Sequence, residues 1–288
     1  MPYTYKTSYG IALSRYNESK NNQPEILLIK KRYTYCYFSF VFGHYKKYNN
    51  KQLQYLFNNM SFGEKVDILS MKFSNIWYRL WLSDPEKNHT IGEYSTPNNN
   101  DTQMRNLKCY LRKKNKFDTI FLRDSGKRLR RLINNSSNSV TPWEIPKGGK
   151  NKTENKNETD LDCAKREFEE ETGLSADKYT ILWNIKPIIS SHKDGDTIYR
   201  AVYYIATFNQ GVKWYPKVKF DTSQQLSELE QVQWVSKPEL KFLNLNEKSQ
   251  KQLLRLFHRI ISTYKKNIKN KYNLCNFTHI EPIQLTDF

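Results

Sequence analysis

Three glutamates in the middle of the chain have a spacing suited to binding a metal ion. Glu167, Glu170 and Glu171 stand at i, i+3 and i+4, which places three carboxylates on one face of a helix. At ~4 Å each pair of these anions costs roughly 1 kcal/mol in water and about 4 kcal/mol near a protein surface. A helix that keeps them together suits a hard divalent cation such as Mg²⁺ or Mn²⁺, which prefers oxygen ligands. A solvated acidic helix face is the alternative for the cluster taken alone.

The surrounding residues resemble the Nudix box. That box reads Gly, five residues, Glu, seven residues, and then Arg-Glu-apolar-x-Glu-Glu-x-Gly-apolar. The upstream glycine departs from it, because eight residues separate Gly149 from Glu158 where the family has five. The rest is in register: Glu158 is followed by the seven residues TDLDCAK and then by Arg166, Glu167, Phe168, Glu170, Glu171, Gly173 and Leu174.

The resemblance implies a role for each matching residue. Glu167, Glu170 and Glu171 would bind Mg²⁺ or Mn²⁺, and the carbonyl of Gly149 would be a further ligand. Arg166 and Glu158 would form an ion pair that orients the helix. The implied reaction is hydrolysis of a P–O–P linkage of the nucleoside diphosphate type. In such a reaction the metal neutralises phosphate and activates a bound water, and a carboxylate left partly free accepts the proton.

Two further acids are weaker matches. Many Nudix sequences have a glutamate, often a base or metal ligand, before an apolar strand that ends in Trp. In SELEQVQWV, Glu228 precedes an apolar stretch that includes Trp234, which resembles this family pattern. An ordinary loop acid is the alternative, and Glu230 nearby could be confused with it. Asp194, in the turn SSHKDGDT, would be a metal ligand by resemblance to viral members of the family.

The elements that must position these residues form two patterns. Period-two alternation predicts strands in KTSYGIAL and EILLIKK, and again in VTPWEIP, YTILWNIKPII, IYRAVYYIATF and LEQVQWV. Apolar residues at helical spacing fill the region between, where Ser61 and Glu64 have the spacing of a capping box. Two of its helices are expected around Met104 to Lys116 and around Ser125 to Asn134. A long C-terminal helix closes the fold.

The resemblance extends beyond the box, to the mRNA-decapping Nudix hydrolases of large cytoplasmic DNA viruses, most closely the African swine fever virus type and more distantly poxviruses. KTSYGIAL, IKKRY, LFNNMSFGE, SNIWYRLWL, WEIPKG and CAKREFEEETG carry it over roughly positions 6 to 235. It implies an α+β protein with the Nudix α/β/α sandwich and a mostly helical inserted domain. We expect residues 1–36 and 137–288 to form the Nudix domain and residues 37–136 the insertion.

Composition limits the class of protein and of partner. With 47 Lys+Arg against 29 Asp+Glu the net charge is +18, which favours a polyanionic partner. The chain has no apolar run of about 18 residues and no secretory signal, and its four distant cysteines read as reduced thiols. We therefore expect no membrane span and a cytoplasmic protein, in the host cytoplasm if the protein is viral.

The densest basic region is expected to contact the single-stranded RNA body. Contacts between basic side chains and RNA phosphates make the affinity fall steeply as the salt concentration rises. Because the basic residues of this region are clustered with few acidic residues between them, RNA contact is favoured over a solvated helix face. The aromatic residues Phe42, Tyr45, Trp143 and Tyr199 are available to stack on a methylated guanine, and none is assigned. The basic residues are Arg112, Lys113, Lys114, Arg123, Lys127, Arg128, Arg130 and Arg131.

The resemblance implies hydrolysis of the 5′ cap of mRNA, which releases 7-methyl-GDP and 5′-monophosphate RNA, so capped mRNA is the expected partner. A diphosphoinositol polyphosphate or nucleotide pyrophosphohydrolase is an alternative, since those substrates are also highly anionic. A non-catalytic RNA-binding Nudix scaffold is another, although degenerate members usually lose box acids and this chain keeps them. Exposed apolar faces carrying Trp77 and Trp81 predict a homodimer through the helical domain.

Overall fold

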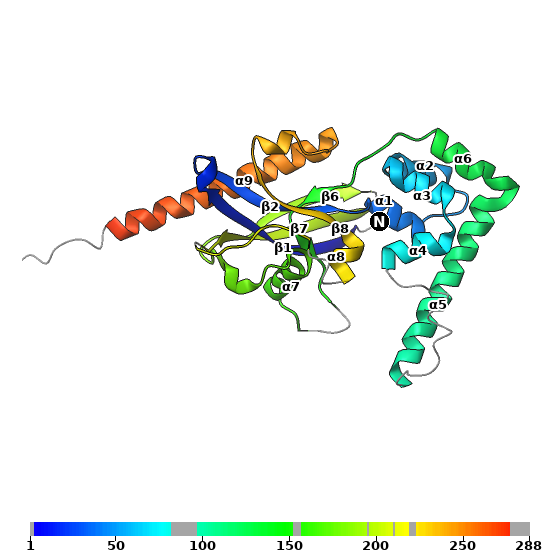
Figure 1. Ribbon diagram of the computed structural model, residues 1–288, viewed down its shortest axis with the longest axis horizontal. Helices are drawn as coiled ribbons and strands as arrows, with labels where there is room; N and C mark the ends of the chain where they lie inside the picture. Colours follow the sequence, from blue (N-terminus) through cyan, green and yellow to red (C-terminus); the bar gives the residue numbers. More distant parts are fainter. Residues whose placement is uncertain are drawn as a thin grey trace, which may run out of the picture.

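Two bodies of the protein lie side by side along its long axis (Figure 1). The computed structural model describes residues 3–81, 97–151, 157–194, 196–209, 211–218 and 223–276. One body is a mixed sheet with helices on both faces, and the other is a bundle of helices inserted between the second and third strands. The predicted α/β/α sandwich with a helical insertion is therefore confirmed. No helix among these residues is long and apolar enough to cross a membrane.

The sheet is built around the hairpin of β1 (Thr4–Asn17) and β2 (Gln23–Lys31). Asn21 in its turn has a φ of 53°, a left-handed conformation that asparagine tolerates better than most residues. β7 runs parallel to β1, and β8 runs antiparallel to β2, so residues far apart in sequence meet at the ends of the hairpin. The other strands are β3 (Trp143–Glu144), β4 (Lys147–Gly148), β5 (Tyr179–Ile181), β6 (Ile188–Asp194), β7 (Thr197–Phe208) and β8 (Leu229–Ser236).

Alternation along the strands sends successive side chains into two different cores. Leu13 packs with Phe168 of α7 on one face, whereas Leu28 packs with Phe257 of α9 on the other. Figure 1 shows these two helices on opposite sides of the sheet. The helices of this body are α7 (Asp160–Thr172), α8 (Ser223–Glu228) and α9 (Glu247–Asn276), with short turns η1 (Glu18–Lys20), η5 (Ala176–Lys178) and η6 (Glu239–Lys241).

The helical insertion has a hydrophobic core of its own. Phe40 lies at its centre, with ring centroids 5.1 Å from Phe57 and 5.2 Å from Phe121. Aromatic pairs at this separation add to the free energy gained by burial. The insertion comprises α1 (Tyr35–Val41), α2 (Asn50–Asn58), α3 (Phe62–Ser70), α4 (Phe73–Trp81), α5 (Pro97–Phe117), a π-helical turn η3 (Asp118–Leu122), η4 (Arg123–Gly126) and α6 (Lys127–Asn134).

The N-terminus of α3 holds both chain segments that join the insertion to the sheet. Glu64 accepts hydrogen bonds from Thr34 N and Oγ1 at 2.5 and 2.8 Å, just ahead of α1. It also forms the predicted capping box with Ser61, which is confirmed. The neighbouring Lys65, 2% exposed, donates to the carbonyl of Ser137 beyond α6. One helical turn therefore fixes the beginning and the end of the insertion.

The helix expected around Ser125 to Asn134 is confirmed as α6, which begins at Lys127. Asp124, Ser125 and Gly126 have φ values of 51°, 52° and 74°, and this left-handed run cannot continue a right-handed helix.

The expected exposure of Trp77 is wrong. Its side chain is 7% exposed and its ring centroid lies 5.6 Å from that of Tyr110, inside the core of the insertion. Trp77 cannot present an apolar face to a second copy, because it is already covered within the protein. Trp81, at the end of α4, is 46% exposed. The homodimer through the helical domain stays a prediction.

Candidate active site

Helix α7 carries the acidic cluster, and the local sequence fixes both of its ends. Thr159 caps the N-terminus, accepting a hydrogen bond from the third helical amide at 3.1 Å. Gly173 ends the helix in a left-handed conformation with a φ of 66°. Phe168 anchors the inner face in the core. These constraints set the rotation of the helix about its axis, and with it the direction of the side chains of Arg166, Glu167, Glu170 and Glu171.

Arg166 lies at the centre of the cluster. Its Nε is 2.7 Å from Glu158 Oε1, and its Nη1 is 2.9 Å from Glu167 Oε1 and 3.1 Å from Glu170 Oε2. Its Nη2 donates to the carbonyl oxygen of Gly149 at 3.0 Å. Two carboxylates of α7 and one loop carbonyl therefore converge on a single cationic group. The hydrogen bond from Arg166 also holds the pKa of Glu158 below its usual range.

Strand β4 places glycine directly against Glu167. Gly148 pairs with Tyr9 of β1, and a Cβ added to Gly148 would lie 2.0 Å from Glu167 Oε2. A Cβ added to Gly10 on β1 would lie 2.2 Å from the carbonyl oxygen of Pro146. Gly10 needs the close backbone approach that only glycine permits, whereas at Gly148 the space is filled by the end of the Glu167 side chain. The residue against which Glu167 packs is thus Gly148, next to the predicted Gly149.

A buried lysine joins Glu171 to Glu228. Lys31 Nζ, at the end of β2, lies 2.6 Å from Glu171 Oε1 and 3.0 Å from Glu228 Oε2. The other oxygen of Glu171 accepts from the backbone N of Lys147 at 2.9 Å. Glu230, which sequence reasoning could confuse with Glu228, instead pairs at 2.7 Å with Lys30 at the surface. Glu228 is therefore the acid of this pair that lies beside the α7 cluster.

Glu144 connects this lysine to the helical insertion. The hydroxyl of Tyr35, in α1, lies 2.9 and 2.8 Å from the two oxygens of Glu144, in β3. The carboxylate also pairs with Lys147 Nζ and lies 4.0 Å from Lys31 Nζ. Burial alone would raise the pKa of Glu144, but Lys147 and Lys31 hold it below the ordinary value.

Burial dominates the electrostatics of two carboxylates of α7, Glu171 and Glu167. Glu171 is 4% exposed, and burial raises its pKa to about 7 even though Lys31 acts in the opposite direction. Burial also raises the pKa of Glu167, while Arg166 opposes the rise and the nearby charges of Glu170 and Glu228 add to it. Because the charge of Glu228 contributes to the raised pKa of Glu167, the two carboxylates are close enough to interact electrostatically.

The donor set fits a hard divalent cation by its chemistry. Six carboxylates (Glu144, Glu158, Glu167, Glu170, Glu171 and Glu228) face three cations (Lys31, Lys147 and Arg166), which leaves an excess of negative charge. All potential ligands are oxygens, as Mg²⁺ and Mn²⁺ prefer. Within the described part of the chain no three acidic, His or Cys side chains form a ready metal cluster. The guanidinium of Arg166 lies where two carboxylates and the Gly149 carbonyl meet.

Sequence reasoning missed three residues of this network: Lys31, Glu144 and Lys147. A signal for Lys31 was present, because it continues the buried alternation of Leu27 and Ile29 and so points inward at the end of its strand. Charges in that position usually have a partner. The predicted ligand Asp194 is the last residue of β6, and its side chain lies outside the described residues.

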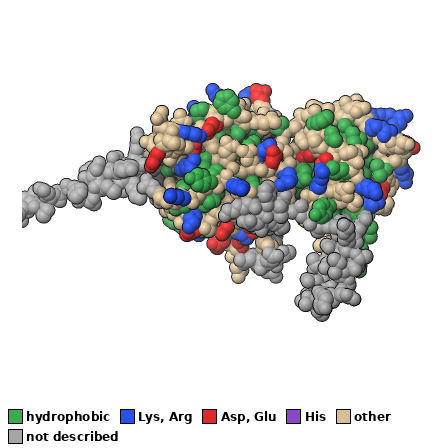
Figure 2. Space-filling view, viewed as in Figure 1, with side chains coloured by type: hydrophobic (Ala, Val, Ile, Leu, Met, Phe, Trp, Pro, Cys, Tyr) green, Lys and Arg blue, Asp and Glu red, His purple; other side chains and the backbone are tan. Residues whose placement is uncertain are grey.

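The predicted RNA-contacting residues divide into two groups. Lys127, Arg128 and Arg131 line one groove of about 660 Å³ between α6 and the α1–α2 loop, which we call the basic groove. Lys113 lies on α5 beside Gly43, outside that groove. Figure 2 shows the Lys and Arg side chains gathered over α6, at the end of the molecule away from the sheet. Arg112, Arg123 and Arg130 are exposed, and Lys114 forms an ion pair with Asp118 at 2.7 Å.

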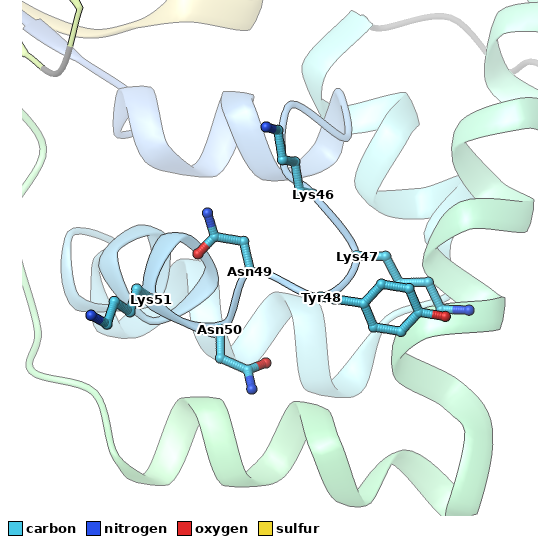
Figure 3. A pocket seen from close by; sticks show the side chains of 6 residues that line it. All are labelled: Lys46, Lys47, Tyr48, Asn49, Asn50 and Lys51. Atoms are coloured by element: carbon cyan, nitrogen blue, oxygen red, sulfur yellow. The ribbon is translucent and has the colours of Figure 1, made fainter.

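The α1–α2 loop supplies further cations that sequence reasoning did not single out. Residues 46–51 surround a hollow of about 540 Å³, with Lys47 and Tyr48 projecting to the same side (Figure 3). Tyr48 is 81% exposed, and Lys47 Nζ lies 5.0 Å from its ring centroid. Arg128 Nη2 donates to Lys47 O at 2.7 Å and to Asn50 Oδ1 at 2.9 Å, so this arginine holds the loop in place.

The four aromatic residues noted for guanine stacking have different surroundings. Tyr45 and Trp143 are buried in the cores of the two bodies, and their burial leaves no free ring face for a ligand. Phe42 stacks on His44 with centroids 5.5 Å apart, and Tyr199 stacks on His192 at 5.0 Å.

Comparison with known proteins places the chain in a family. The NUDIX domain matches residues 116–257. Over 244 residues the chain is 32% identical to the mRNA-decapping protein g5R of a Namibian warthog isolate of African swine fever virus, covering 83% of this chain and 88% of that protein. The g5R protein of a Kenyan pig isolate is 31% identical over 247 residues, covering 84% and 89%. A solved C. elegans Ap4A hydrolase covers 89% of this chain and 98% of its own with 11% identity and a TM-score of 0.38, which is too weak to bear on the substrate. The chain is a member of the Nudix hydrolase family.

Proposed function

We propose that the protein is an mRNA-decapping hydrolase that cleaves the pyrophosphate linkage of the 5′ cap and releases 7-methyl-GDP and 5′-monophosphate RNA. The observation that carries the proposal is the convergence of Glu167, Glu170 and the Gly149 carbonyl on one cationic position, with Glu171 alongside in the same helix. Two relatives named mRNA-decapping proteins, each covering more than four-fifths of this chain, support the choice of capped RNA.

The residues of the site divide into ligands and supports. Nudix hydrolases generally use divalent metal ions, and here Glu167, Glu170, Glu171 and the Gly149 carbonyl would hold Mg²⁺ or Mn²⁺. When bound, the ion supplies charge neutralisation at the phosphates and acidifies a water. Glu158 holds Arg166, and Arg166 restrains the α7 carboxylates. Glu228 lies beside this group as a candidate base. For Asp194 the ligand role rests on the family resemblance alone.

The basic groove is the proposed contact for the RNA body. Lys127, Arg130 and Arg131 are exposed on α6, and the exposed ring of Tyr48 beside the groove is suited to stacking on a base. Arg112, Lys113, Lys114 and Arg123 would extend the field on neighbouring elements. We further infer that the enzyme acts in the cytoplasm, in that of the host if the protein is viral, because capped mRNA is translated there.

The test uses RNA labelled in the cap, incubated with the full chain and Mg²⁺ or Mn²⁺. The wild type is expected to release 7-methyl-GDP, and Glu171→Gln is expected to release none. Glu169→Gln is the matched control, because Glu169 lies on the same helix but is exposed and outside the cluster. Release of 7-methyl-GMP instead, or full activity in Glu171→Gln, would contradict the proposal.

Two competing functions give different results in the same assay. A diphosphoinositol polyphosphate or nucleotide pyrophosphohydrolase would turn over those substrates and would not be inhibited by uncapped RNA. A non-catalytic RNA-binding scaffold would hydrolyse no pyrophosphate substrate with either metal, yet would still bind RNA.

A further inference from the structure

Lys31 occupies an unusual place for a lysine. It ends a strand whose preceding residues Leu27 and Ile29 are fully buried, and its own side chain is 9% exposed. Its ammonium donates to Glu171 at 2.6 Å and to Glu228 at 3.0 Å. Glu171 belongs to α7 and Glu228 to the end of α8, so one buried cation ties together two elements that are separate in the chain.

The backbone around Lys31 directs its side chain to this place. The β2–β8 ladder is regular up to Lys30, which pairs with Gln231, but Lys31 pairs with Leu229. The shift leaves Glu230 as an extra residue on β8, which is a β-bulge, and bulges re-aim side chains next to active sites. Beyond the bulge the amide of Arg32 donates to the carbonyl oxygen of Glu228 at 2.7 Å. The backbone of Glu228 is therefore fixed to β2 independently of the Lys31 side chain.

Two carboxylates brought close together repel each other unless a cation lies between them. Glu171 has a second anchor, the backbone N of Lys147, at 2.9 Å. The side chain of Glu228 is 45% exposed, so solvent competes for it and its direction depends on the contact with Lys31. Loss of the ammonium would free the Glu228 carboxylate while the backbone stayed in register.

We propose that Lys31 is a positioning residue of the hydrolytic site, which holds the carboxylate of Glu228 in register with Glu171 and the α7 cluster. This inference rests on the proposed function. Lys31 acts through the two glutamates, and its chemistry is that of a fixed positive charge with two directed hydrogen bonds.

The helical insertion supports Lys31 from the other side. Glu144 lies 4.0 Å from Lys31 Nζ, and both of its oxygens lie within 2.9 Å of the hydroxyl of Tyr35, the first residue of α1. The insertion begins four residues after Lys31, so its first helix and the catalytic sheet share this network. Tyr35→Phe is accordingly expected to lower kcat less than a change of Lys31 itself.

The experiment compares Lys31→Met and Lys31→Arg with Lys30→Met. Lys30 is the matched control, because it adjoins Lys31 but points to the opposite face and pairs with Glu230 at the surface. With capped RNA we expect kcat of Lys31→Met to fall by at least about tenfold, since misplaced groups lose rate steeply, while KM stays within about threefold. Lys31→Arg should recover part of kcat, and Lys30→Met should stay within about twofold of wild type.

A double-mutant cycle with Glu228→Gln identifies the residue through which Lys31 acts. If Lys31 positions Glu228, the combined variant should lose about as much kcat as the worse single variant, because each change removes the same interaction. In metal-free protein, a crystal structure of Lys31→Met should show the Glu228 carboxylate turned away from Glu171, while backbone hydrogen exchange stays at the wild-type rate at residues 225–229 and across the sheet. Thermal unfolding checks that each variant folds. If Lys31→Met does not fold, the comparison with wild type and Lys30→Met is made with Lys31→Arg.

The outcomes separate the two proposals. If wild type releases no cap product, the proposed function is wrong. If wild type is active and Lys31→Met matches Lys30→Met, or if the losses of Lys31→Met and Glu228→Gln multiply, the inference on Lys31 is wrong. Equal loss in Lys31→Arg and Lys31→Met with raised exchange throughout the sheet would identify a purely structural lysine and would also overturn it.

Discussion

At the scale of single residues, the two glycines of the KGG sequence have opposite surroundings. A Cβ at Gly148 would lie 2.0 Å from Glu167 Oε2, whereas a Cβ at Gly149 would meet nothing within 4 Å. Because the obstructing atoms end a flexible side chain, Gly148→Ala should displace the Glu167 carboxylate and leave the fold intact. Displacement by about 1 Å costs on the order of 10²-fold in rate, so we expect such a loss of kcat for Gly148→Ala.

Gly63→Ala is the control, with kcat expected within about twofold of wild type, because a Cβ at Gly63 of α3 would also meet nothing within 4 Å and this residue lies outside the proposed site. Both variants are assayed on cap-labelled RNA and by thermal unfolding. Equal activity of the two variants would mean that Glu167 does not act from its place beside Gly148.

The pKa of Glu171 predicts how stability depends on pH. Burial raises this pKa to about 7, from an ordinary value of about 4.3 in the unfolded chain. Between these values the folded protein keeps a proton that the unfolded chain has released. The free energy of unfolding should therefore fall by up to about 4 kcal/mol as pH rises through this window. Above about pH 7 the contribution is constant.

Urea unfolding of metal-free protein at about pH 5, 6, 7 and 8 measures this effect as the difference between wild type and Glu171→Gln. The variant lacks the titrating group, so other acids with lowered pKa values, such as Glu158, cancel in the difference. A difference that does not change with pH would show that burial does not perturb Glu171.

At the scale of elements, the sequence predicted strands and helices best where the hydrophobic periodicity is uniform over a long segment. The hairpin of β1 and β2, the amphipathic α7 and the core of α9 follow from alternation or helical spacing that extends over whole segments. Lys31, Glu144 and Lys147 could not be assigned in this way. Their roles arise from contacts between residues far apart in the chain, and sequence spacing carries no information on such distances.

The insertion shows the same limit in its basic residues. Eight cations there were expected on one RNA-contacting surface, and helical spacing correctly places Lys127, Arg130 and Arg131 on the outer face of α6. Arg128 is also a positive charge in the sequence, yet it bonds the α1–α2 loop. Spacing separates inner from outer faces but cannot say which outer charges meet a neighbouring loop.

The junction of the insertion with the sheet gives a prediction about stability. Lys65 is 2% exposed and donates to Ser137 O and to Asn138 Oδ1, which follow α6. Lys65→Met would remove the hydrogen bonds that this charged donor makes to Ser137 and Asn138, and a hydrogen bond to a charged group contributes about 1.5–3 kcal/mol. We expect chemical unfolding to report a loss of that size. Lys108→Met, at an exposed position of α5, should change stability by less than about 0.5 kcal/mol. Equal stability of the two variants would argue against this contact.

At the scale of the whole molecule, the acidic cluster and the basic groove lie in different bodies. The sheet body gathers six carboxylates around the proposed metal site, whereas the helical body carries the basic groove and the cations of α6 (Figure 2). A net charge of +18 would attract RNA to any part of the surface. The arrangement predicts instead that the RNA body is held on the insertion while the cap linkage lies at the sheet.

Salt dependence distinguishes a defined RNA path from general attraction. Each phosphate contact on single-stranded RNA contributes about 0.7 to the slope of log affinity against log salt. Neutralising Lys127, Arg130 and Arg131 together should therefore lower the slope by up to about 2 and weaken binding. Arg128 is left unchanged in this variant, because its bonds to Lys47 and Asn50 support the loop.

Neutralising the exposed Lys237, Lys241 and Lys248 of the sheet body removes the same total charge and serves as the control. General attraction would lower the slope equally in both triple variants, since it depends on net charge alone. A path across the insertion lowers it only in the first. Binding of a fluorescent uncapped RNA at several salt concentrations gives both slopes without requiring turnover. This result is therefore independent of whether the site on α7 hydrolyses the cap. Equal slopes in the two triple variants would show that the RNA body does not bind specifically across the insertion.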